Sequence, residues 1–453
     1  MDILHPFYIR ILKLFFKKVK QIYELFYHYF NVLKICYKTV KSKILFCLNI
    51  QAHTSFFGNH LISFLLKKNA INDKMSINLI GGVLMAILKL VLAFFLSFGQ
   101  IVGPLFVQLT KGEDVFFEEW SKNSAFTEES YVEIEKTPGK DFVILNLTDI
   151  QLGEENVFAK EGEYTKELIT KLVNDKKPDL ITLSGDNAWG YISYLEVIEF
   201  IDSFGIPWAP VMGNHDGEGT GTEFWAAYTL TKAENCLFKF GPKDMGYGNY
   251  IINITENKKI VHTLFMMDTH SSADFEVPGE GLVEGGYDHL WDNQLEWYKW
   301  AVNGIKALND GNVVESTVIL HIPLREYIDA WDAVSVNKTE EKPHGEGDAA
   351  NDAFLHGNIN EDWCPSPVNN GFFDLCKSLG STKTIICGHD HKNDSAVMYE
   401  GICLAYALKS GFGSYWLPEM IGGTTITINS AGSATVENHY YDLAENNWDI
   451  VDD

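Results

Sequence analysis

Residues 382–391 read Thr382-Lys-Thr-Ile-Ile-Cys-Gly-His-Asp-His391, a run of β-branched residues that stops at a glycine, two histidines and an aspartate. Threonine and isoleucine favour strands, so the run predicts a buried strand that ends at the glycine. In α/β proteins, the loops at the carboxyl ends of the strands build the functional site. This polar ending therefore marks candidate functional residues.

Four other apolar runs end in residues of the same kind. They are 142–148 before Asp149, 180–183 before Gly185-Asp186, 208–212 before Gly213-Asn-His-Asp216, and 316–320 before His321. Helical periodicity lies between them at 161–174, 191–204 and 290–308, and hairpin-like pairs of runs follow at 396–407 and 424–441. Alternating strands and helices predict an α/β fold, and the hairpins near the end of the chain make its sheet mixed.

The residue types in these five loops indicate a metal centre. Carboxylates, imidazoles and an amide at the ends of five strands predict one shared cluster rather than five separate sites. Oxygen ligands mixed with imidazole suit Mn, Fe or Zn better than Ca or a metal bound by thiolates. The cluster offers about twice as many ligands as one tetrahedral site needs, so we expect two metal ions.

In order and spacing, the five loops resemble the conserved blocks of the calcineurin-like metallophosphoesterases. The blocks are Asp149-Ile-Gln151, Gly185-Asp-Asn187, Gly213-Asn-His-Asp216, His321 and Gly388-His-Asp-His391. The last block as far as Asp394, together with Ser410-Gly-Phe-Gly-Ser-Tyr415, looks most like the purple-acid-phosphatase-like branch. The resemblance implies a four-layer α/β/β/α sandwich with a mixed pair of sheets.

The resemblance also implies a role for each polar residue of the blocks. The ligands of the two metal ions, divalent or of mixed valence, would be Asp149, Gln151, Asp186, Asn214, His321, His389 and His391. Asp149 and His391 would hold the first metal, and Asp186 would bridge it to the second. His215 would protonate the leaving oxygen or stabilise its charge, and Asp216 would orient His215 by accepting from its ring N–H. The implied reaction is hydrolysis of a phosphate monoester by a metal-activated hydroxide.

Gln151 departs from the usual first block, which reads Asp-x-His. A glutamine carbonyl is neutral and is a poorer donor than imidazole, so the first metal should bind less tightly or with different selectivity. The Mn-dependent ADP-ribose/CDP-alcohol diphosphatases look similar at this position, which raises a nucleoside-diphosphate-type diphosphatase or a phosphodiesterase as an alternative function. A binding protein with a degraded metal centre is a second alternative, and only Gln151 indicates it.

Charged residues are distributed unevenly along the chain. The whole chain of 453 residues has a formal net charge of −25, which argues against a nucleic-acid partner and suits a small phosphorylated substrate. Residues 1–74 instead carry 12 lysines and arginines against three acids, which predicts a basic apolar leader able to contact a membrane surface. This segment could equally precede an initiator at Met75 or Met85.

Residues 75–110 are predicted to be a signal peptide or a single membrane anchor, because 90–109 contain no formally charged residue. The catalytic domain is then expected outside the cytosol, either secreted or anchored. Four glycosylation sequons, at Asn146, Asn253, Asn337 and Asn393, fit a glycoprotein, although Asn146 lies in an expected buried strand. Cys364 and Cys376 could form a loop disulfide in an oxidising compartment.

The remaining segments complete the predicted organisation. Residues 111–139 are expected to be a linker, and 140–453 to be the metallophosphoesterase domain. Residues 322–369 separate His321 from the next strand and are too long for an ordinary connection, so we expect a lid insertion that sets substrate choice. Tyr406 and Tyr415 could line the pocket or belong to the core.

Overall fold

The computed structural model describes residues 99–100, 103–104, 107–108, 111–277, 279 and 281–450. The predicted leader at 1–74 lies outside these residues, as does most of the predicted signal or anchor at 75–110. Within the described part of the chain, no helix is both long enough and apolar enough to cross a membrane.

The smaller of the two main sheets has five strands in the order β17-β16-β2-β3-β4. Its parallel half is made of β2 (Phe142–Leu147), β3 (Leu180–Ser184) and β4 (Trp208–Val211). The hairpin of β16 (Gly422–Ile428) and β17 (Ala434–Tyr440) adds to β2 in antiparallel fashion. The sheet is therefore mixed, as the sequence predicts.

The larger sheet has eight strands in the order β1-β5-β6-β9-β13-β15-β14-β12. From one edge to the other they are β1 (Val132–Glu135), β5 (Tyr250–Glu256), β6 (Lys259–Met266), β9 (Ser316–Ile319), β13 (Thr382–Cys387), β15 (Ile402–Tyr406), β14 (Ala396–Tyr399) and β12 (Phe354–His356). The four strands from β6 to β15 run parallel to one another. The carboxyl ends of β9 and β13 consequently lie side by side.

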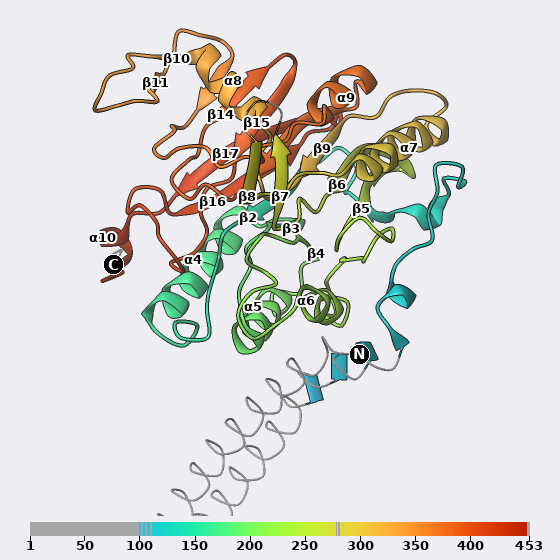
Figure 1. Ribbon diagram of the computed structural model, residues 1–453, viewed down its shortest axis with the longest axis horizontal. Helices are drawn as coiled ribbons and strands as arrows, with labels where there is room; N and C mark the ends of the chain where they lie inside the picture. Colours follow the sequence, from blue (N-terminus) through green and yellow to red (C-terminus); the bar gives the residue numbers. More distant parts are fainter. Residues whose placement is uncertain are drawn as a thin grey trace, which may run out of the picture. The chain divides into compact units, whose positions relative to one another are not determined.

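Helices cover the outer face of each sheet, which confirms the predicted four-layer α/β/β/α sandwich (Figure 1). The small sheet is covered by α4 (Lys160–Lys176), α5 (Tyr191–Asp202) and α6 (Glu223–Leu230). The large sheet is covered by α7 (Asp292–Leu308), α8 (Glu326–Val334) and α9 (Phe372–Leu379). Because both sheets have covered faces, their central strands are buried at nearly every position.

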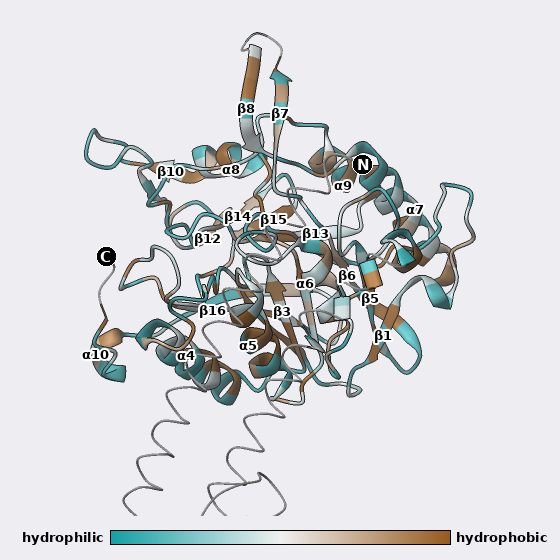
Figure 2. Cartoon of the chain, turned by 60° about the horizontal axis from the view of Figure 1, so that its bottom comes forward, coloured by the Kyte–Doolittle hydropathy of each residue, from teal (hydrophilic) through white to brown (hydrophobic). Residues whose placement is uncertain are grey.

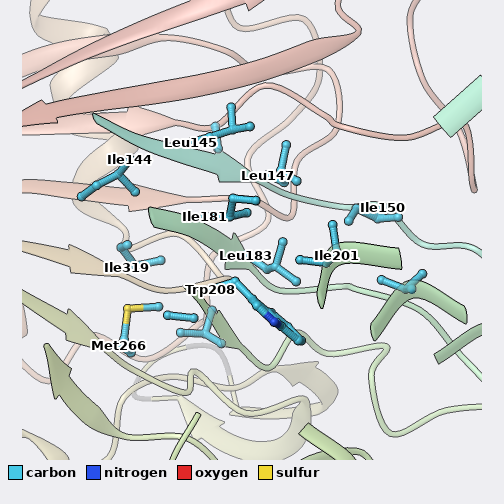
Figure 3. Close-up of a cluster of buried hydrophobic side chains, with 14 of the residues drawn as sticks. Ile144, Leu145, Leu147, Ile150, Ile181, Leu183, Ile201, Trp208, Met266 and Ile319 are labelled. Atoms are coloured by element: carbon cyan, nitrogen blue, oxygen red, sulfur yellow. The ribbon is translucent and has the colours of Figure 1, made fainter. Parts of the chain in front are cut away.

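The two sheets share an apolar core. Ile144 and Ile181 of the small sheet belong to the same buried cluster as Met266 and Ile319 of the large sheet (Figure 3). The other face of the large sheet packs against α7, whose buried side chains recur at helical spacing. The loops that carry the predicted ligands are thus attached to strands that the core holds on both faces.

Smaller elements complete the described part of the chain. They are η1 (Asp114–Phe116), η2 (Glu128–Ser130), β7 (Ser272–Val277), β8 (Gly281–Tyr287), β10 (Ser335–Val336), β11 (Glu346–Gly347) and α10 (Leu443–Asn446). The β7–β8 hairpin stands out from the rest of the domain in Figure 2.

The predicted linker at 111–139 is in part a component of the fold. Its strand β1 pairs in parallel with β5 and forms one edge of the large sheet. Phe126 of the same segment packs against Trp300 of α7, with ring centroids 5.0 Å apart. This strand was not predicted from the sequence, because it spans only four residues and short apolar-polar alternation is a weak signal.

Two modification predictions also need correction. Three of the four sequon asparagines, Asn146, Asn253 and Asn393, are buried, so only Asn337 is exposed enough to carry a glycan. Cys364 and Cys376 are both free, and the expected disulfide is not formed. Cys376 points into the core from α9, because its helix packs on β13, whereas Cys364 lies in a loop beside Asp390.

Candidate metal centre

Five strand ends bring the predicted ligands together. Five predicted ligands lie two or three residues beyond a strand: Asp149 after β2, Asp186 after β3, Asn214 after β4, His321 after β9 and His389 after β13. The ligand atoms of Asp149, Asp186 and His321 all lie within 4.8 Å of one another. The shared edge of the sheets therefore produces a buried cluster with the donor set of a metal site.

Four of the predicted ligands adopt an unusual backbone conformation. The φ angles of Asp149, Gln151, Asp186 and His389 are 51°, 45°, 51° and 80°, which places these non-glycine residues in the left-handed region. Such a conformation costs on the order of 1 kcal/mol or more per residue and is concentrated at functional sites. Left-handed backbone thus recurs in the loops that follow β2, β3 and β13.

Glycines in two of the blocks allow the loops to approach one another. A Cβ atom on Gly213 would lie 2.3 Å from Oδ1 of Asp186, and one on Gly388 would lie 2.6 Å from Oδ2 of Asp149. Any larger residue would push these carboxylates out of place. The glycines of the motifs are thus required by the packing of the ligands themselves.

His321 is the centre of one group of ligands. Its Nδ1 bonds to the carbonyl oxygen of Ser184 at 2.9 Å, which leaves Nε2 with a lone pair when the ring is neutral. Around Nε2 lie Oδ1 of Asn214 at 3.0 Å, Nδ1 of His389 at 3.3 Å and Oδ2 of Asp186 at 3.3 Å. Four electron-pair donors that point at one another need a cation or a proton between them.

Asp149 is the centre of the other group. Its Oδ2 accepts from the Thr148 hydroxyl at 2.8 Å and from the His389 amide at 3.0 Å, while Oδ1 lies 3.3 Å from Nε2 of His391. The Nδ1 of His391 bonds to the carbonyl oxygen of Tyr415 at 2.8 Å. The other ring nitrogen of His391, Nε2, therefore faces the cluster, as Nε2 of His321 does.

Gln151 joins the two groups. Its Nε2 donates to Oδ2 of Asp186 at 2.6 Å, while its carbonyl oxygen is buried without a hydrogen-bond partner. Among the described residues, Oδ1 of Asp149 likewise has no hydrogen-bond partner, and it faces Nε2 of His391 at 3.3 Å. Since buried polar atoms are normally paired, these two oxygens fit ligands of a metal centre.

The electrostatics of the cluster agree with cation binding. Burial opposes the charged form of Asp186, but the His321 ring outweighs it and lowers the pKa of that carboxyl to about 2. Burial likewise disfavours a charged His321, yet Asp186 and Asp149 raise its pKa to about 10. Burial and the His321 ring lower the pKa of His389 to about 3, so this imidazole stays neutral and able to bind a metal.

His215 and Asp216 are placed differently from the expected pair. The ring Nδ1 of His215 lies 2.8 Å from Oε2 of Glu218, not against Asp216. The Asp216 carboxylate is buried and accepts from the amides of Gly213 at 2.7 Å and Asn187 at 2.9 Å. Asp216 thus ties together the loops after β3 and β4, because its side chain points inward while the His215 ring stays at the surface.

Sequence reasoning also overlooked Lys409, whose side chain is 1% exposed and donates from Nζ to the carbonyl oxygen of Asp149 at 2.7 Å. A lysine directly after the apolar run 402–408 was the available signal. Nothing in the sequence marked Glu218 as the partner of His215, because carboxylates in surface turns are common.

Comparison with known proteins settles the family. The family model of the calcineurin-like phosphoesterases matches residues 142–393, which is more than half of the chain and includes every predicted metal ligand. The chain belongs to the calcineurin-like phosphoesterase family.

Within this family, relatives carry purple acid phosphatase and phosphatase names. The chain is 28% identical to "Probable inactive purple acid phosphatase 14" of Arabidopsis thaliana over 60% of this chain and 71% of that protein. It is 27% identical to "Phosphatase DCR2" of Saccharomyces cerevisiae over 58% of this chain and 46% of that one. A solved dimetal phosphatase from Danio rerio aligns with 68% of this chain and 100% of its own length, at 10% identity and a TM-score of 0.39. The purple acid phosphatase name of the Arabidopsis relative confirms the predicted resemblance to the purple-acid-phosphatase-like branch.

Proposed function

We propose that this protein hydrolyses phosphate monoesters at a centre of two metal ions, Mn, Fe or Zn. The observation that carries the proposal is the set of converging donor atoms, of which the buried Asp149 Oδ1 and Gln151 Oε1 have no hydrogen-bond partner. Asp149, Gln151 and His391 would hold one ion, Asn214, His321 and His389 the other, and Asp186 would serve both. The metal pair would supply Lewis acidity and a hydroxide nucleophile at neutral pH.

The chain itself would handle the proton of the leaving group. His215 is partly exposed beside the cluster, and its backbone amide donates to Oδ1 of Asp186 at 2.9 Å. Burial alone lowers the pKa of His215, but Asp186 and Glu218 together raise it. An imidazolium with Nδ1 held by Glu218 keeps Nε2–H for the oxygen of the departing alcohol.

Two alternatives rest on specific observations. Gln151 favours a Mn-dependent nucleoside-diphosphate-type diphosphatase or a phosphodiesterase on the same centre. Two Arabidopsis relatives named probable inactive purple acid phosphatases favour a binding protein, whereas the yeast relative is named a phosphatase. Hydrolysis of p-nitrophenyl phosphate, bis-p-nitrophenyl phosphate and ADP-ribose with added Mn separates these functions.

Asp186→Asn is the decisive variant. It keeps the size of the side chain but removes the charge shared by both metal ions, so we expect metal content to fall and kcat/KM to drop by roughly 10²-fold or more. The matched control is Asp268→Asn, because Asp268 is an equally buried aspartate that follows β6 and bonds to the amides of Tyr247 and His270. The control should retain metal and turnover. Full activity of Asp186→Asn would end the proposal.

We also propose that the domain works outside the cytosol, secreted or membrane-anchored, on the basis of the apolar sequence at 77–109. Treatment of intact vesicles with a protease tests this proposal. The domain should resist digestion from the cytosolic side and become sensitive when detergent opens the vesicles.

A further inference from the structure

Three aromatic side chains lie against three different histidines of the candidate centre. The pairs, with the distance between ring centroids, are Tyr287 and His389 at 4.3 Å, Tyr415 and His391 at 4.1 Å, and Trp189 and His215 at 5.9 Å. We call Trp189, Tyr287 and Tyr415 the aromatic collar. His389 and His391 are predicted metal ligands, and His215 is partly exposed beside them, so the collar borders the place where a phosphate ester would react.

The three rings come from separate parts of the fold. Trp189 lies in the loop after β3, Tyr287 ends strand β8, and Tyr415 lies in the loop between β15 and β16. The hairpin that carries Tyr287 stands out from the rest of the domain (Figure 2). Loops and a hairpin that converge on one site from different strands form a rim rather than a continuous layer of core.

The collar remains accessible to a ligand. Tyr415 is 38% exposed, and Trp189 and Tyr287 are partly exposed. Tyr287 and Tyr415 pack against His389 and His391, which lie two residues apart in one loop. The two tyrosines therefore lie beside the same part of the centre, where a planar group could stack against them.

The charges around the collar exclude a polyanionic leaving group. Glu218 bonds to His215, which packs against Trp189, and Glu361 accepts from the amide of Lys392, whose Nζ lies 5.0 Å from the centroid of the Tyr415 ring. Arg325, the one arginine in the described part of the chain, is directed to the carbonyls of Ser366 and Pro367. A second phosphate would meet more negative than positive charge, whereas an uncharged ring would not.

We propose that the aromatic collar selects phosphate monoesters whose alcohol carries a planar aromatic ring and no further phosphate. The proposal rests on the phosphomonoesterase function proposed above and names its substrate class. Stacking of a ring on such side chains strengthens binding by roughly 5- to 100-fold. Nucleoside monophosphates and aryl or arylmethyl phosphates both have this chemistry.

Matched ligand pairs test the collar without a change in leaving-group chemistry. Adenosine 5′-monophosphate and ribose 5-phosphate differ by the base, and benzyl phosphate and cyclohexylmethyl phosphate differ by the planarity of the ring. Calorimetric binding to the Mn-loaded protein, together with kcat/KM, should favour the planar member of at least one pair by about tenfold or more. The pair that shows the preference identifies the source, nucleoside or aryl. Equal binding within both pairs would overturn the proposal.

Variants assign the preference to the collar. Tyr287→Leu and Tyr415→Leu should each raise the Kd and KM of the planar ligand several-fold and leave those of its matched partner and the metal content unchanged. Tyr287→Phe should keep the preference, because the ring remains. The control is Tyr399→Leu, since Tyr399 is a partly exposed tyrosine that packs on Phe373 of α9. A planar preference that survives both leucine variants would refute the role of the collar.

The two proposals fail in distinguishable ways. If the protein binds the planar ligands preferentially but does not hydrolyse them, the collar stands and the phosphatase proposal falls. If it hydrolyses both members of each pair equally well, the phosphatase stands and the collar proposal falls.

Discussion

Lys409 shows how a single buried charge shapes the candidate centre. Its ammonium group donates to the carbonyl oxygen of Asp149, a residue held at a φ of 51°. The next residue, Ser410, bonds through its amide to the carbonyl oxygen of Thr148 at 2.9 Å. Lys409 and Ser410 thus hold the loop after β2 in its strained form, and the positive charge partly balances the nearby carboxylates.

We predict that Lys409→Met weakens binding of the first metal by roughly tenfold, because the Asp149 loop loses its support. Metal titration followed by calorimetry measures the change. Lys136→Met is the matched control: Lys136 is equally buried, but it pairs with Glu256 at 3.0 Å beside the edge strand β1. The control should lower stability and leave metal affinity intact, and equal metal affinities in the two variants would contradict the prediction.

Gln151 supports a second prediction at the residue scale. Gln151→Ala removes an unpartnered buried carbonyl oxygen, so we expect one of the two metal ions to bind at least about tenfold more weakly. Metal analysis after dialysis against a low metal concentration should then find close to one ion per chain. Unchanged stoichiometry and affinity would show that Gln151 is not a ligand.

At the scale of elements, the segment 322–369 has two parts. Its first part is built into the fold, because α8 packs on β14 and β12 extends the large sheet beyond β14. Its last part runs beside the loop of His389 and His391, where Glu361 accepts from the amide of Lys392 at 2.7 Å. A lid role stays a prediction for this last part alone, since removal of the first part would expose a sheet edge.

A substitution at Trp331 of α8 tests whether the first part of segment 322–369 is built into the fold. The side chain is 0% exposed, and its indole N–H donates to the carbonyl oxygen of His344 at 2.6 Å. We predict that Trp331→Ala lowers the free energy of unfolding by about 3–5 kcal/mol, as expected for a buried tryptophan. Urea denaturation measures it. Trp291→Ala, at a site that is 37% exposed, should lower the free energy of unfolding clearly less. Equal decreases in the two variants would argue that α8 is loosely attached.

At the scale of the whole molecule, His262 links the two sheets. It belongs to β6 of the large sheet, and its Nδ1 bonds to the carbonyl oxygen of Gly432 in the turn between β16 and β17 at 2.7 Å. Its Nε2 lies 3.0 Å from the hydroxyl of Thr317 in β9. Burial lowers the pKa of His262 to about 4, so the ring is neutral in the folded protein at neutral pH.

This lowered pKa predicts a pH dependence of stability. Between pH 6.5 and 4 the unfolded chain takes up a proton at His262 and the folded chain does not, so stability falls as the pH falls, by up to about 3 kcal/mol. Denaturation of wild type and His262→Gln at pH 7 and pH 4.5 tests the assignment. The variant should lose less stability on acidification, and parallel losses would exclude His262 as the source.

Much of the architecture followed from local patterns. The runs before Asp149, Asp186 and His321 are apolar because central strands of a covered sheet are buried on both faces, and they predicted their strands to within one or two residues. The short edge strand β1 and the β7–β8 hairpin escaped prediction. Edge elements are half-exposed, so their sequences lack a continuous apolar signal.

The sequence by itself determined which donor atoms are present and that strand ends present them, because periodicity and residue chemistry are local properties. Only the tertiary structure decided their partners: Glu218 rather than Asp216 for His215, Lys409 beneath Asp149, and three aromatic rings against three histidines. These contacts join segments far apart in the chain, or depend on the direction in which a turn points its side chains. No local pattern encodes either one.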